Sequence, residues 1–283
     1  MKNTGLILEG GGNRGIFTAG VLDYLMEQDF YVPYVAGVSA GACNAVDYVS
    51  RQIGRTKKCM IGEPEDNPTM SLRYLLEKRS LIDMDLIFDH YPNEKIPFDF
   101  DVYFASETKC ELVVTNCRTG KPEYLDDRQD KIRLMNIARA SSSLPFVTPM
   151  LELDGELYLD GGIADAIPIR RSFQQGYKKN IVILTRQKGY RKVRSKHSER
   201  LSVILYKDYP EIVKLLHYRH RLYNKTLDLI ERLENEGHLF VIRPNEVMIS
   251  RTETNREGME AFYDHGYEIA KASYSKLLEY VEK

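Results

Sequence analysis

Cysteine is scarce in this sequence, and the few cysteines form no recognisable pattern. The 283 residues include four of them, and no two form a C-x-x-C pair: Cys43, Cys59, Cys110 and Cys117. This count is too low for a disulfide-stabilised secreted scaffold, and the spacing does not fit a zinc site. We therefore expect a reducing compartment and no bound metal.

The chain also lacks a surplus of charge of either sign. Forty basic residues stand against forty-one acidic ones, which gives a net charge of −1. A protein that binds nucleic acid through a globally basic surface is excluded by this balance, so we expect no nucleic-acid partner.

Long apolar runs are missing as well. The longest uncharged stretch covers the 17 residues from Phe30 to Val46 and is interrupted by Pro33, Gly37 and Gly41. A membrane-spanning helix needs about 20 apolar residues, and the first residues do not resemble a secretion signal. The expectation is a cytoplasmic protein that contacts membranes, if at all, from the surface.

The order of the patterns that are present predicts a parallel α/β fold. Leu6-Ile7-Leu8 is a short apolar run typical of a buried strand, and a helical pattern follows from Ile16 to Met26. A second strand is expected at residues 31–36, and small residues at 42–45 predict a helix packed close to a sheet. Strand, helix, strand and helix in this order open a sheet that is covered by helices.

Further elements are predicted along the rest of the chain. They are a loop at 63–68, a helix at 70–78, a hairpin of strands at 111–116 and 122–125, a helix at 131–141, and strands at 156–159 and 180–185. Beyond residue 185 the patterns become mostly helical. We therefore expect a core of residues 1–185 and a mainly helical C-terminal extension, residues 186–283, packed on that core.

Gly37-x-Ser39-x-Gly41 stands where the second strand meets its helix. A serine on such a sharp turn projects its hydroxyl from the end of a sheet, above a helix N-terminus. The glycines on both sides are needed because the turn leaves no room for a Cβ. This placement predicts that Ser39 is a nucleophile.

A glycine-rich loop, Gly10-Gly11-Gly12-Asn13-Arg14-Gly15, follows the first strand and opens the first helix. One interpretation is a dinucleotide-binding loop, which would require an acidic residue at the end of the second strand; that strand ends instead at Ser39. The other interpretation is an oxyanion hole, in which the amides of Gly10, Gly11 and Gly12 converge on one point and the helix dipole adds positive potential. Arg14 would then either orient the loop or point to solvent.

A serine nucleophile needs a base, and the histidines give no clear candidate. None of the six lies in a loop that closes a strand: His90, His197, His217, His220, His238 and His265. Asp160-Gly161-Gly162 does close a predicted strand, and its glycines permit close approach of the backbone.

Taken together and in this order, the three motifs resemble those of the patatin-like phospholipase family. The segment 140–146 is similar to the family's stretch before the aspartate, and the resemblance covers roughly residues 5–185. It implies a three-layer α/β/α fold and cleavage of acyl esters of lipids or phospholipids by a Ser–Asp dyad, without a metal or cofactor. By position, the resemblance makes Ser39 the nucleophile, Asp160 the base and the Gly10–Gly12 amides the oxyanion hole. The other matching motif positions are Arg14, Gly15, Gly37, Gly41, Gly161 and Gly162.

Two other functions stay open at this stage. An α/β-hydrolase with a Ser–Asp–His triad would use a histidine later in the chain than Asp160. A non-hydrolytic nucleotide-binding protein would use the glycine-rich loop for a pyrophosphate.

Residues 186–200 contain seven lysines and arginines. They predict either contact with an anionic membrane surface or a solvated loop.

Overall fold

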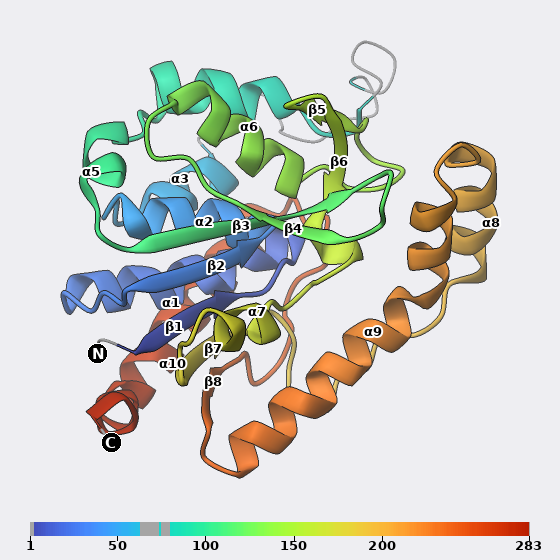
Figure 1. Ribbon diagram of the computed structural model, residues 1–283. Helices are drawn as coiled ribbons and strands as arrows, with labels where there is room; N and C mark the ends of the chain where they lie inside the picture. Colours follow the sequence, from blue (N-terminus) through green and yellow to red (C-terminus); the bar gives the residue numbers. More distant parts are fainter. Residues whose placement is uncertain (1–2, 63–73, 75–79, 283) are drawn as a thin grey trace.

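A mostly parallel sheet forms the centre of the protein, which the computed structural model describes over residues 3–62, 74 and 80–282 (Figure 1). The eight strands have the order β5-β6-β3-β2-β1-β7-β8, with β4 also paired to β3. Neighbours among β3, β2, β1, β7 and β8 are parallel, while β4 and β6 run antiparallel to β3. The strands are β1 (Thr4–Leu8), β2 (Tyr34–Val38), β3 (Lys109–Asn116), β4 (Pro122–Leu125), β5 (Leu151–Leu153), β6 (Glu156–Asp160), β7 (Lys179–Ile183) and β8 (Leu239–Ile242).

Helices cover both faces of the sheet and make a three-layer structure. One face carries α1 (Gly15–Glu27), α2 (Ala40–Val49), α6 (Lys131–Ser141) and α10 (Arg256–Glu282), and the other carries α7 (Ile169–Gln174) and α9 (Pro210–Asn235). Among the described residues, the other helical elements are η1 (Gly12–Arg14), α3 (Arg55–Ile61), η2 (Leu86–Lys95), α5 (Phe100–Ala105), η3 (Gly161–Ile163) and α8 (Lys196–Leu205). The expected α/β/α architecture is confirmed.

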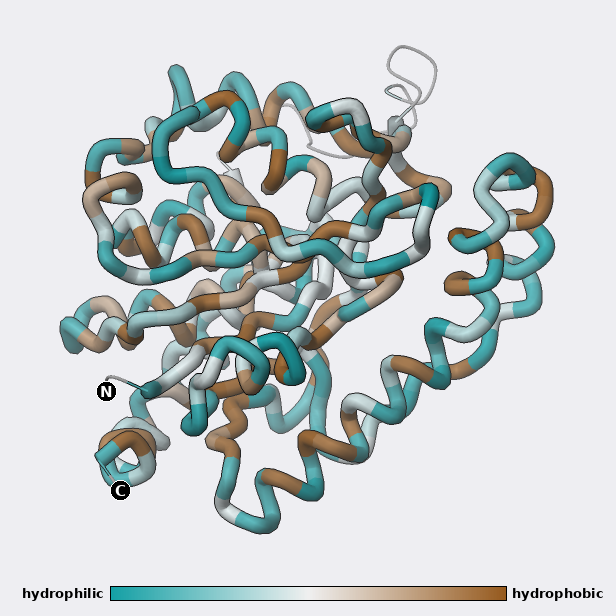
Figure 2. The backbone as a smooth tube through the Cα atoms, in the orientation of Figure 1, coloured by the Kyte–Doolittle hydropathy of each residue, from teal (hydrophilic) through white to brown (hydrophobic). Residues whose placement is uncertain are grey.

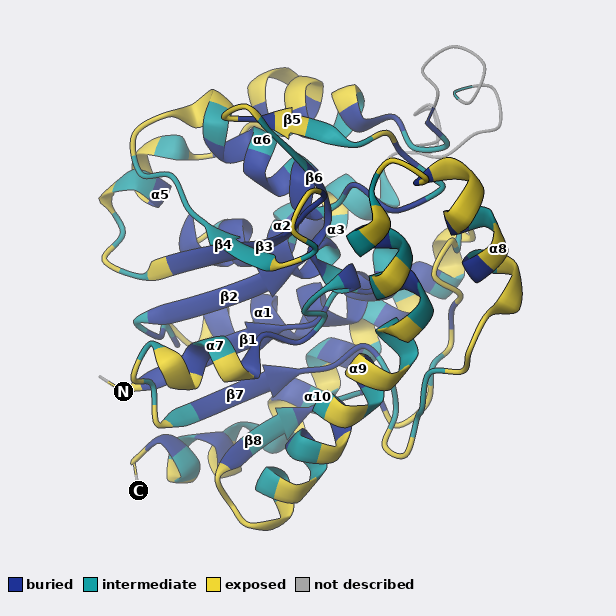
Figure 3. Ribbon diagram, turned by 45° about the vertical axis from the view of Figure 1, so that its right-hand side comes forward, coloured by how far each residue is buried: buried dark blue, intermediate teal, exposed yellow. Residues whose placement is uncertain are grey.

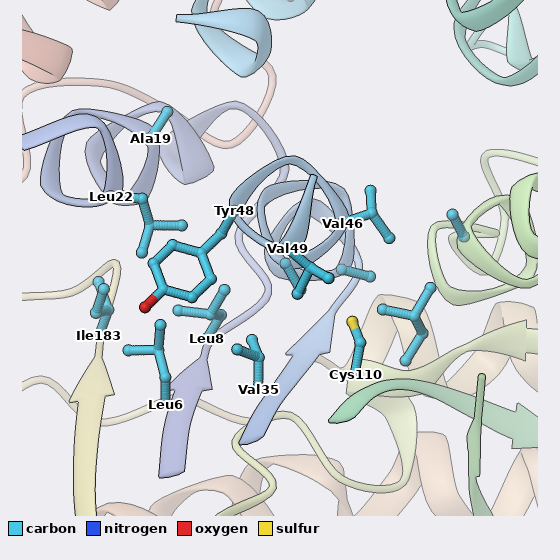
Figure 4. Packing of buried hydrophobic residues seen from close by; sticks show 14 of the residues in the cluster. Leu6, Leu8, Ala19, Leu22, Val35, Val46, Tyr48, Val49, Cys110 and Ile183 are labelled. Atoms are coloured by element: carbon cyan, nitrogen blue, oxygen red, sulfur yellow. The ribbon is translucent and has the colours of Figure 1, made fainter. Parts of the chain in front are cut away.

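The alternation of side chains along β1 explains how the two layers are held. Leu6 and Leu8 pack in the cluster formed with α1 and α2, whereas Ile7 packs in the cluster formed with α7 and α9. Figure 4 shows the first of these clusters, with Leu22 and Tyr48 lying over the strands. Because both faces are covered, the central strands are buried throughout, as Figure 3 shows.

Most predicted elements are found within two or three residues of their expected bounds. The second strand begins at Tyr34 rather than at residue 31, because Pro33 has no N–H to donate to the sheet. The loop expected at 63–68 and, apart from Tyr74, the helix expected at 70–78 lie outside the described residues.

The strand β8 was not predicted, and it lies in the stretch expected to be mainly helical. This four-residue strand pairs in parallel with β7 and extends the central sheet. The boundary expected near residue 186 is therefore crossed by a continuous sheet. Figure 2 shows the apolar residues gathered in the strands and alternating with hydrophilic ones along α9. None of the described helices has the length and apolar character needed to cross a membrane.

Two glycines allow α1 and α10 to cross at close range. A Cβ on Gly20 would lie 2.1 Å from the carbonyl oxygen of Tyr263, and a Cβ on Gly266 would lie 2.1 Å from that of Phe17. No side chain fits between the two backbones at these points. The C-terminal helix is therefore fixed against the helix that carries the glycine-rich loop.

We predict that Gly266→Ala lowers the free energy of unfolding by about 1–3 kcal/mol, because the added methyl forces α1 and α10 apart. Gly258→Ala is the matched control on the same helix, since its nearest neighbouring atom would be 3.5 Å away. That control should be neutral or up to about 1 kcal/mol more stable, because alanine favours helix. Urea unfolding of both variants measures the difference, and equal stabilities would show that the crossing tolerates a side chain.

Candidate active site

Ser39 lies on a strained turn between β2 and α2. Its backbone has φ 56° and ψ −124°, a conformation that a residue with a side chain rarely adopts. A Cβ on Gly37 would lie 2.3 Å from the oxygen of Gly41, and one on Gly41 would lie 2.5 Å from the oxygen of Leu8. The Gly-x-Ser-x-Gly spacing is thus a steric requirement of this turn, as the sequence analysis expected.

Ser141, at the end of α6, holds the turn in place. The Ser39 N–H donates to the Ser141 hydroxyl oxygen at 2.9 Å, and that hydroxyl donates to the Val113 carbonyl at 2.6 Å. All three residues are buried. Ser141 was not predicted as a site residue, although it lies in the segment 140–146 that contributed to the family resemblance.

The register of three strands brings Asp160 to Ser39. In β3, Val113 is opposite Val38 of β2, and Val114 is opposite Asp160 of β6. Since β4 occupies the other edge of β3 at both positions, β2 and β6 share one edge and meet end to end. The residue that ends β6 is therefore adjacent to the turn that follows β2.

Asp160 is a buried carboxyl with one free oxygen. It is 3% exposed; its Oδ1 accepts the Gly162 N–H at 2.7 Å, and its Oδ2 has no hydrogen-bond partner among the described residues. Burial raises the pKa of Asp160, against the opposing effects of the Ser39 hydroxyl and of Arg251. The hydroxyl is close enough to lower this pKa, although it makes no hydrogen bond of standard geometry to the carboxylate. A raised pKa makes Asp160 a stronger base than an exposed aspartate.

The glycine-rich loop lies against Ser39. A Cβ on Gly10 would be 3.1 Å from the Cβ of Ser39, and Gly12 has a positive φ of 57°. Within the described part of the chain, the amides of Gly10, Gly11 and Gly12 donate to no acceptor. Free backbone donors beside a serine on a strained turn are the arrangement that stabilises an oxyanion.

Two cavities of different character meet at Ser39. The first, of about 150 Å³, continues from Ser39 between α2, α3, η2 and α6, and most of its lining is apolar, including Val46, Met84, Phe88 and Met135. The second, of about 410 Å³, contains Ser39 and Asp160 together with five cationic residues: Arg14, Arg186, Lys192, Arg219 and Arg251. We call these the apolar cavity and the cationic cavity.

The residues predicted from sequence fall into two groups. Ser39, Asp160, Gly10 and Gly162 line the cationic cavity, and Gly12 lines the apolar cavity. Gly11, Gly15, Gly37, Gly41 and Gly161 line neither cavity and pack closely behind the site.

Arg14 is buried and faces the cationic cavity, so the interpretation that it points to solvent is wrong. Its neighbours there include Glu9 and Arg186.

The histidines are all described, and none of them lines either cavity. His90 pairs with Glu94, the ring of His217 contacts the carbonyl of Glu199, and His265 accepts the amide of Asn245. The structure therefore offers no histidine for a Ser–Asp–His triad at Ser39. It also offers no acidic residue at the end of β2 for a dinucleotide.

Glu9 and several residues of the C-terminal third were missed as parts of the site. Glu9 is buried at the end of β1 and accepts hydrogen bonds from the Thr185 N–H at 2.6 Å, from its hydroxyl at 3.1 Å, and from the Tyr223 hydroxyl. The Asn13 N–H donates to the carbonyl of Arg251 at 3.0 Å. These contacts join α9 and the segment before α10 to the loops beside Ser39.

The basic run 186–200 is not a single surface. Arg191 pairs with Asp228 and Glu231, and Arg194 pairs with Glu199. Arg186 and Lys192 line the cationic cavity, whereas Lys188, Lys196 and Arg200 are exposed.

Comparison with known proteins gives two matching family models. The one described as "Patatin-like phospholipase" matches residues 6–171, and a domain of unknown function, DUF6363, matches residues 209–282. The uncharacterised protein YjjU of Escherichia coli K12 is 33% identical over 186 residues, which are 64% of this chain and 51% of YjjU. The chain thus spans about half the length of this relative.

Among solved structures, that of VipD from Legionella pneumophila is similar in fold. It matches 96% of this chain and 66% of VipD with a TM-score of 0.52 at 14% identity.

We predict that Asp160→Asn stabilises the fold at neutral pH. Because burial raises the folded-state pKa of Asp160 above its unfolded value, the parent loses stability as pH rises from about 4. The side chain of the variant stays neutral. At pH 8 its free energy of unfolding should therefore exceed that of the parent by about 1 kcal/mol, which raises Tm by roughly 2–4 °C. The difference should shrink at pH 4.5.

Asp127→Asn provides the control of opposite sign. Asp127 accepts the amides of Gln129 and Asp130 and pairs with Arg133, and these contacts outweigh desolvation and lower its pKa. A lowered pKa means that the ionised Asp127 stabilises the fold at pH values above its unfolded pKa. Asp127→Asn should therefore be less stable than the parent at pH 8. Thermal unfolding from pH 4.5 to 8 checks both; an Asp160→Asn variant less stable at pH 8 would contradict the raised pKa.

Proposed function

Because the chain belongs to the patatin-like phospholipase family, we propose that it is a lipid acyl hydrolase with Ser39 as nucleophile and Asp160 as base. The observation that carries the proposal is the meeting of Ser39, on its strained turn, with one buried carboxylate and free glycine amides. A serine hydroxyl is a weak nucleophile until a neighbouring base takes its proton. Asp160 has an oxygen free for that proton.

In the first half of the reaction, the Ser39 Oγ attacks the ester carbonyl carbon as its proton passes to Asp160. The carbonyl oxygen gains the negative charge, and the amides of Gly10–Gly12, with no acceptor of their own in the described chain, stabilise it. Collapse of this intermediate breaks the ester bond. The leaving alcohol takes the proton from Asp160, and the acyl group stays on Ser39.

In the second half, Asp160 takes a proton from water, whose oxygen attacks the acyl carbon. The bond to Ser39 then breaks, and the proton held by Asp160 returns to the serine oxygen. The fatty acid and the free enzyme are the products. No histidine and no metal ion take part in this scheme.

The apolar cavity is suited to the acyl chain. Its lining of aliphatic, methionine and aromatic side chains starts at Ser39, so a chain that enters it places its ester at the nucleophile. Cys43 also lines this cavity, but burial raises the pKa of its thiol to about 11. The thiol therefore stays protonated at neutral pH and does not compete with Ser39.

Substrates of this kind reside in membranes, and α8 offers a surface that can reach them. In Figures 1 and 3, α8 stands clear of the sheet at the far end of α9. Val203, Ile204 and Leu205 at its end are 53%, 69% and 54% exposed. Arg200, also exposed, precedes Val203 and Ile204 by three and four positions and shares their face. We propose peripheral membrane contact here rather than through the whole run 186–200.

We predict that Ser39→Ala and Asp160→Asn each lower kcat/KM on a short p-nitrophenyl ester by about 10²–10⁴-fold. The double variant should lose little more than either single one, because each change disables the same proton transfer. Asp165→Asn is the control: Asp165 is half-buried nearby, accepts the Tyr124 hydroxyl at 2.8 Å, and lines neither cavity at Ser39. Asp165→Asn should stay within a few-fold of the parent.

Labelling with a fluorophosphonate, followed by peptide mapping, should place the label on Ser39. A label on another residue, or an Asp160→Asn variant as active as the Asp165→Asn control, would contradict the proposed dyad.

We also predict that replacing Val203, Ile204 and Leu205 by serine lowers recovery with anionic vesicles by at least tenfold, because each buried apolar side chain contributes about 1.5–3 kcal/mol. Ile132→Ser is the control, since Ile132 is 67% exposed on α6, away from α8. Hydrolysis of the monomeric p-nitrophenyl ester should not change. Co-sedimentation equal to that of the parent would exclude α8 as the contact surface.

A further inference from the structure

The cationic cavity holds more positive charge than its surroundings balance. Arg14 comes from η1, and the other four cations come from the C-terminal third: Arg186, Lys192, Arg219 and Arg251. Two carboxylates, Glu9 and Asp160, line the same cavity. Glu9 already accepts three hydrogen bonds, from Thr185 and Tyr223.

None of the five cations forms an ion pair within the part of the chain that the structure describes. By contrast, two arginines of the same basic run are paired: Arg191 with Asp228 and Glu231 of α9, and Arg194 with Glu199 of α8. In addition, the Nε atoms of Arg14 and Arg219 are buried without a hydrogen-bond acceptor. Buried donors without partners are rare unless a ligand supplies the acceptor.

The cations are held in fixed positions rather than extended into solvent. The Arg186 guanidinium lies 4.5 Å from the centre of the Tyr190 ring, and the Lys192 ammonium lies 4.6 Å from that of Tyr223. The backbone of Lys192 exchanges two hydrogen bonds with the Asn224 side chain, at 2.8 and 3.0 Å. A set of cations ordered before binding loses little entropy when an anion arrives.

Burial and the neighbouring cations lower the pKa of two of these groups. Burial, and then the neighbouring Arg219 and Arg251, lower the pKa of Lys192 to about 7. Burial and Arg186 lower the pKa of Arg14 to about 10. An anion in the cavity would relieve both effects, because it favours the charged form of each group.

We propose that the cationic cavity binds the phosphate-bearing, anionic headgroup of the acyl lipid whose chain occupies the apolar cavity. This inference rests on the proposed function and specifies its substrate class. Ser39 lines both cavities, so an ester between chain and headgroup lies at the nucleophile when both are filled. Guanidinium groups match phosphate oxygens in charge and geometry. A headgroup that carries a quaternary ammonium would meet repulsion from the same cations.

The test compares lysophosphatidate with lysophosphatidylcholine of the same acyl chain, below the concentration at which either aggregates. The parent should favour lysophosphatidate in kcat/KM by tenfold or more. Arg219→Gln and Lys192→Met should each reduce that ratio by about tenfold to a hundredfold, since each removes a charge-assisted contact to phosphate. Arg219→Lys should recover part of the preference for lysophosphatidate. Using the ratio separates headgroup recognition from any effect on the chemical step.

Lys196→Met is the matched control. Lys196 belongs to the same basic run but is exposed and outside the cavity, so its removal should leave the ratio unchanged. If Lys196→Met lowered the ratio as much as Lys192→Met does, the preference would come from the general surface charge, and the assignment of the cavity would be overturned.

Binding to the Ser39→Ala protein gives a second measurement that needs no catalysis. Calorimetry should detect binding of lysophosphatidate, and weaker binding of lysophosphatidylcholine and of inorganic phosphate. Selective binding by Ser39→Ala, together with a parent protein that hydrolyses neither lipid, would support the headgroup site and contradict the proposed hydrolase. Hydrolysis of both lipids with a ratio near one, and no selective binding, would leave the hydrolase and overturn the headgroup site. Inorganic phosphate that binds as tightly as lysophosphatidate would assign the cavity to free phosphate.

Discussion

Two strands meet end to end on one edge of β3, and the positions of the candidate catalytic groups depend on that meeting. A parallel strand and an antiparallel strand that share an edge bring their carboxyl ends together, so β2 delivers Ser39 where β6 delivers Asp160. The same point on β3 also anchors Ser141, which accepts the Ser39 amide and donates to Val113. The backbone at Ser39 stays in its strained conformation because the strand register, two glycines and this buried serine together hold it there.

The electrostatics of the site balance two opposing demands on Asp160. A base must be ionised before it can accept a proton, yet a carboxylate that is too well stabilised accepts protons poorly. Burial disfavours the ionised form, whereas Arg251 and Arg219 favour it. The cationic cavity thus favours the ionised form of Asp160 that the proposed base requires, and it retains positive charge for the proposed anionic headgroup. In the proposed reaction, headgroup binding and proton transfer therefore depend on one set of charges.

The sequence predicted those parts of the site in which a nearby backbone leaves no room for a side chain. Gly37 meets the backbone of Gly41 in its own turn, whereas Gly41 and Gly161 meet the backbones of Leu8 and Val113 in neighbouring strands. All three glycines are visible in the sequence as parts of short motifs. The start of β2 was misplaced because the apolar run continues across Pro33, which has no N–H to donate to the sheet. β8 was missed because four apolar residues between helices are too few to distinguish a strand from a helix end. These four residues form a strand because they pair with β7.

Contacts between residues far apart in sequence could not be predicted in the same way. Whether an arginine of the run 186–200 is neutralised depends on where α9 places Asp228 and Glu231, and so Arg191 and Lys192 differ in role although they are neighbours. The C-terminal third supplies β8 to the sheet, Tyr223 to Glu9 and the carbonyl of Arg251 to the glycine-rich loop. Ser39 and Asp160 therefore line a cavity whose far wall is built by residues outside the segment that matches the patatin-like phospholipase model. Under the proposed function, substrate choice can change through that wall while Ser39 and Asp160 stay the same.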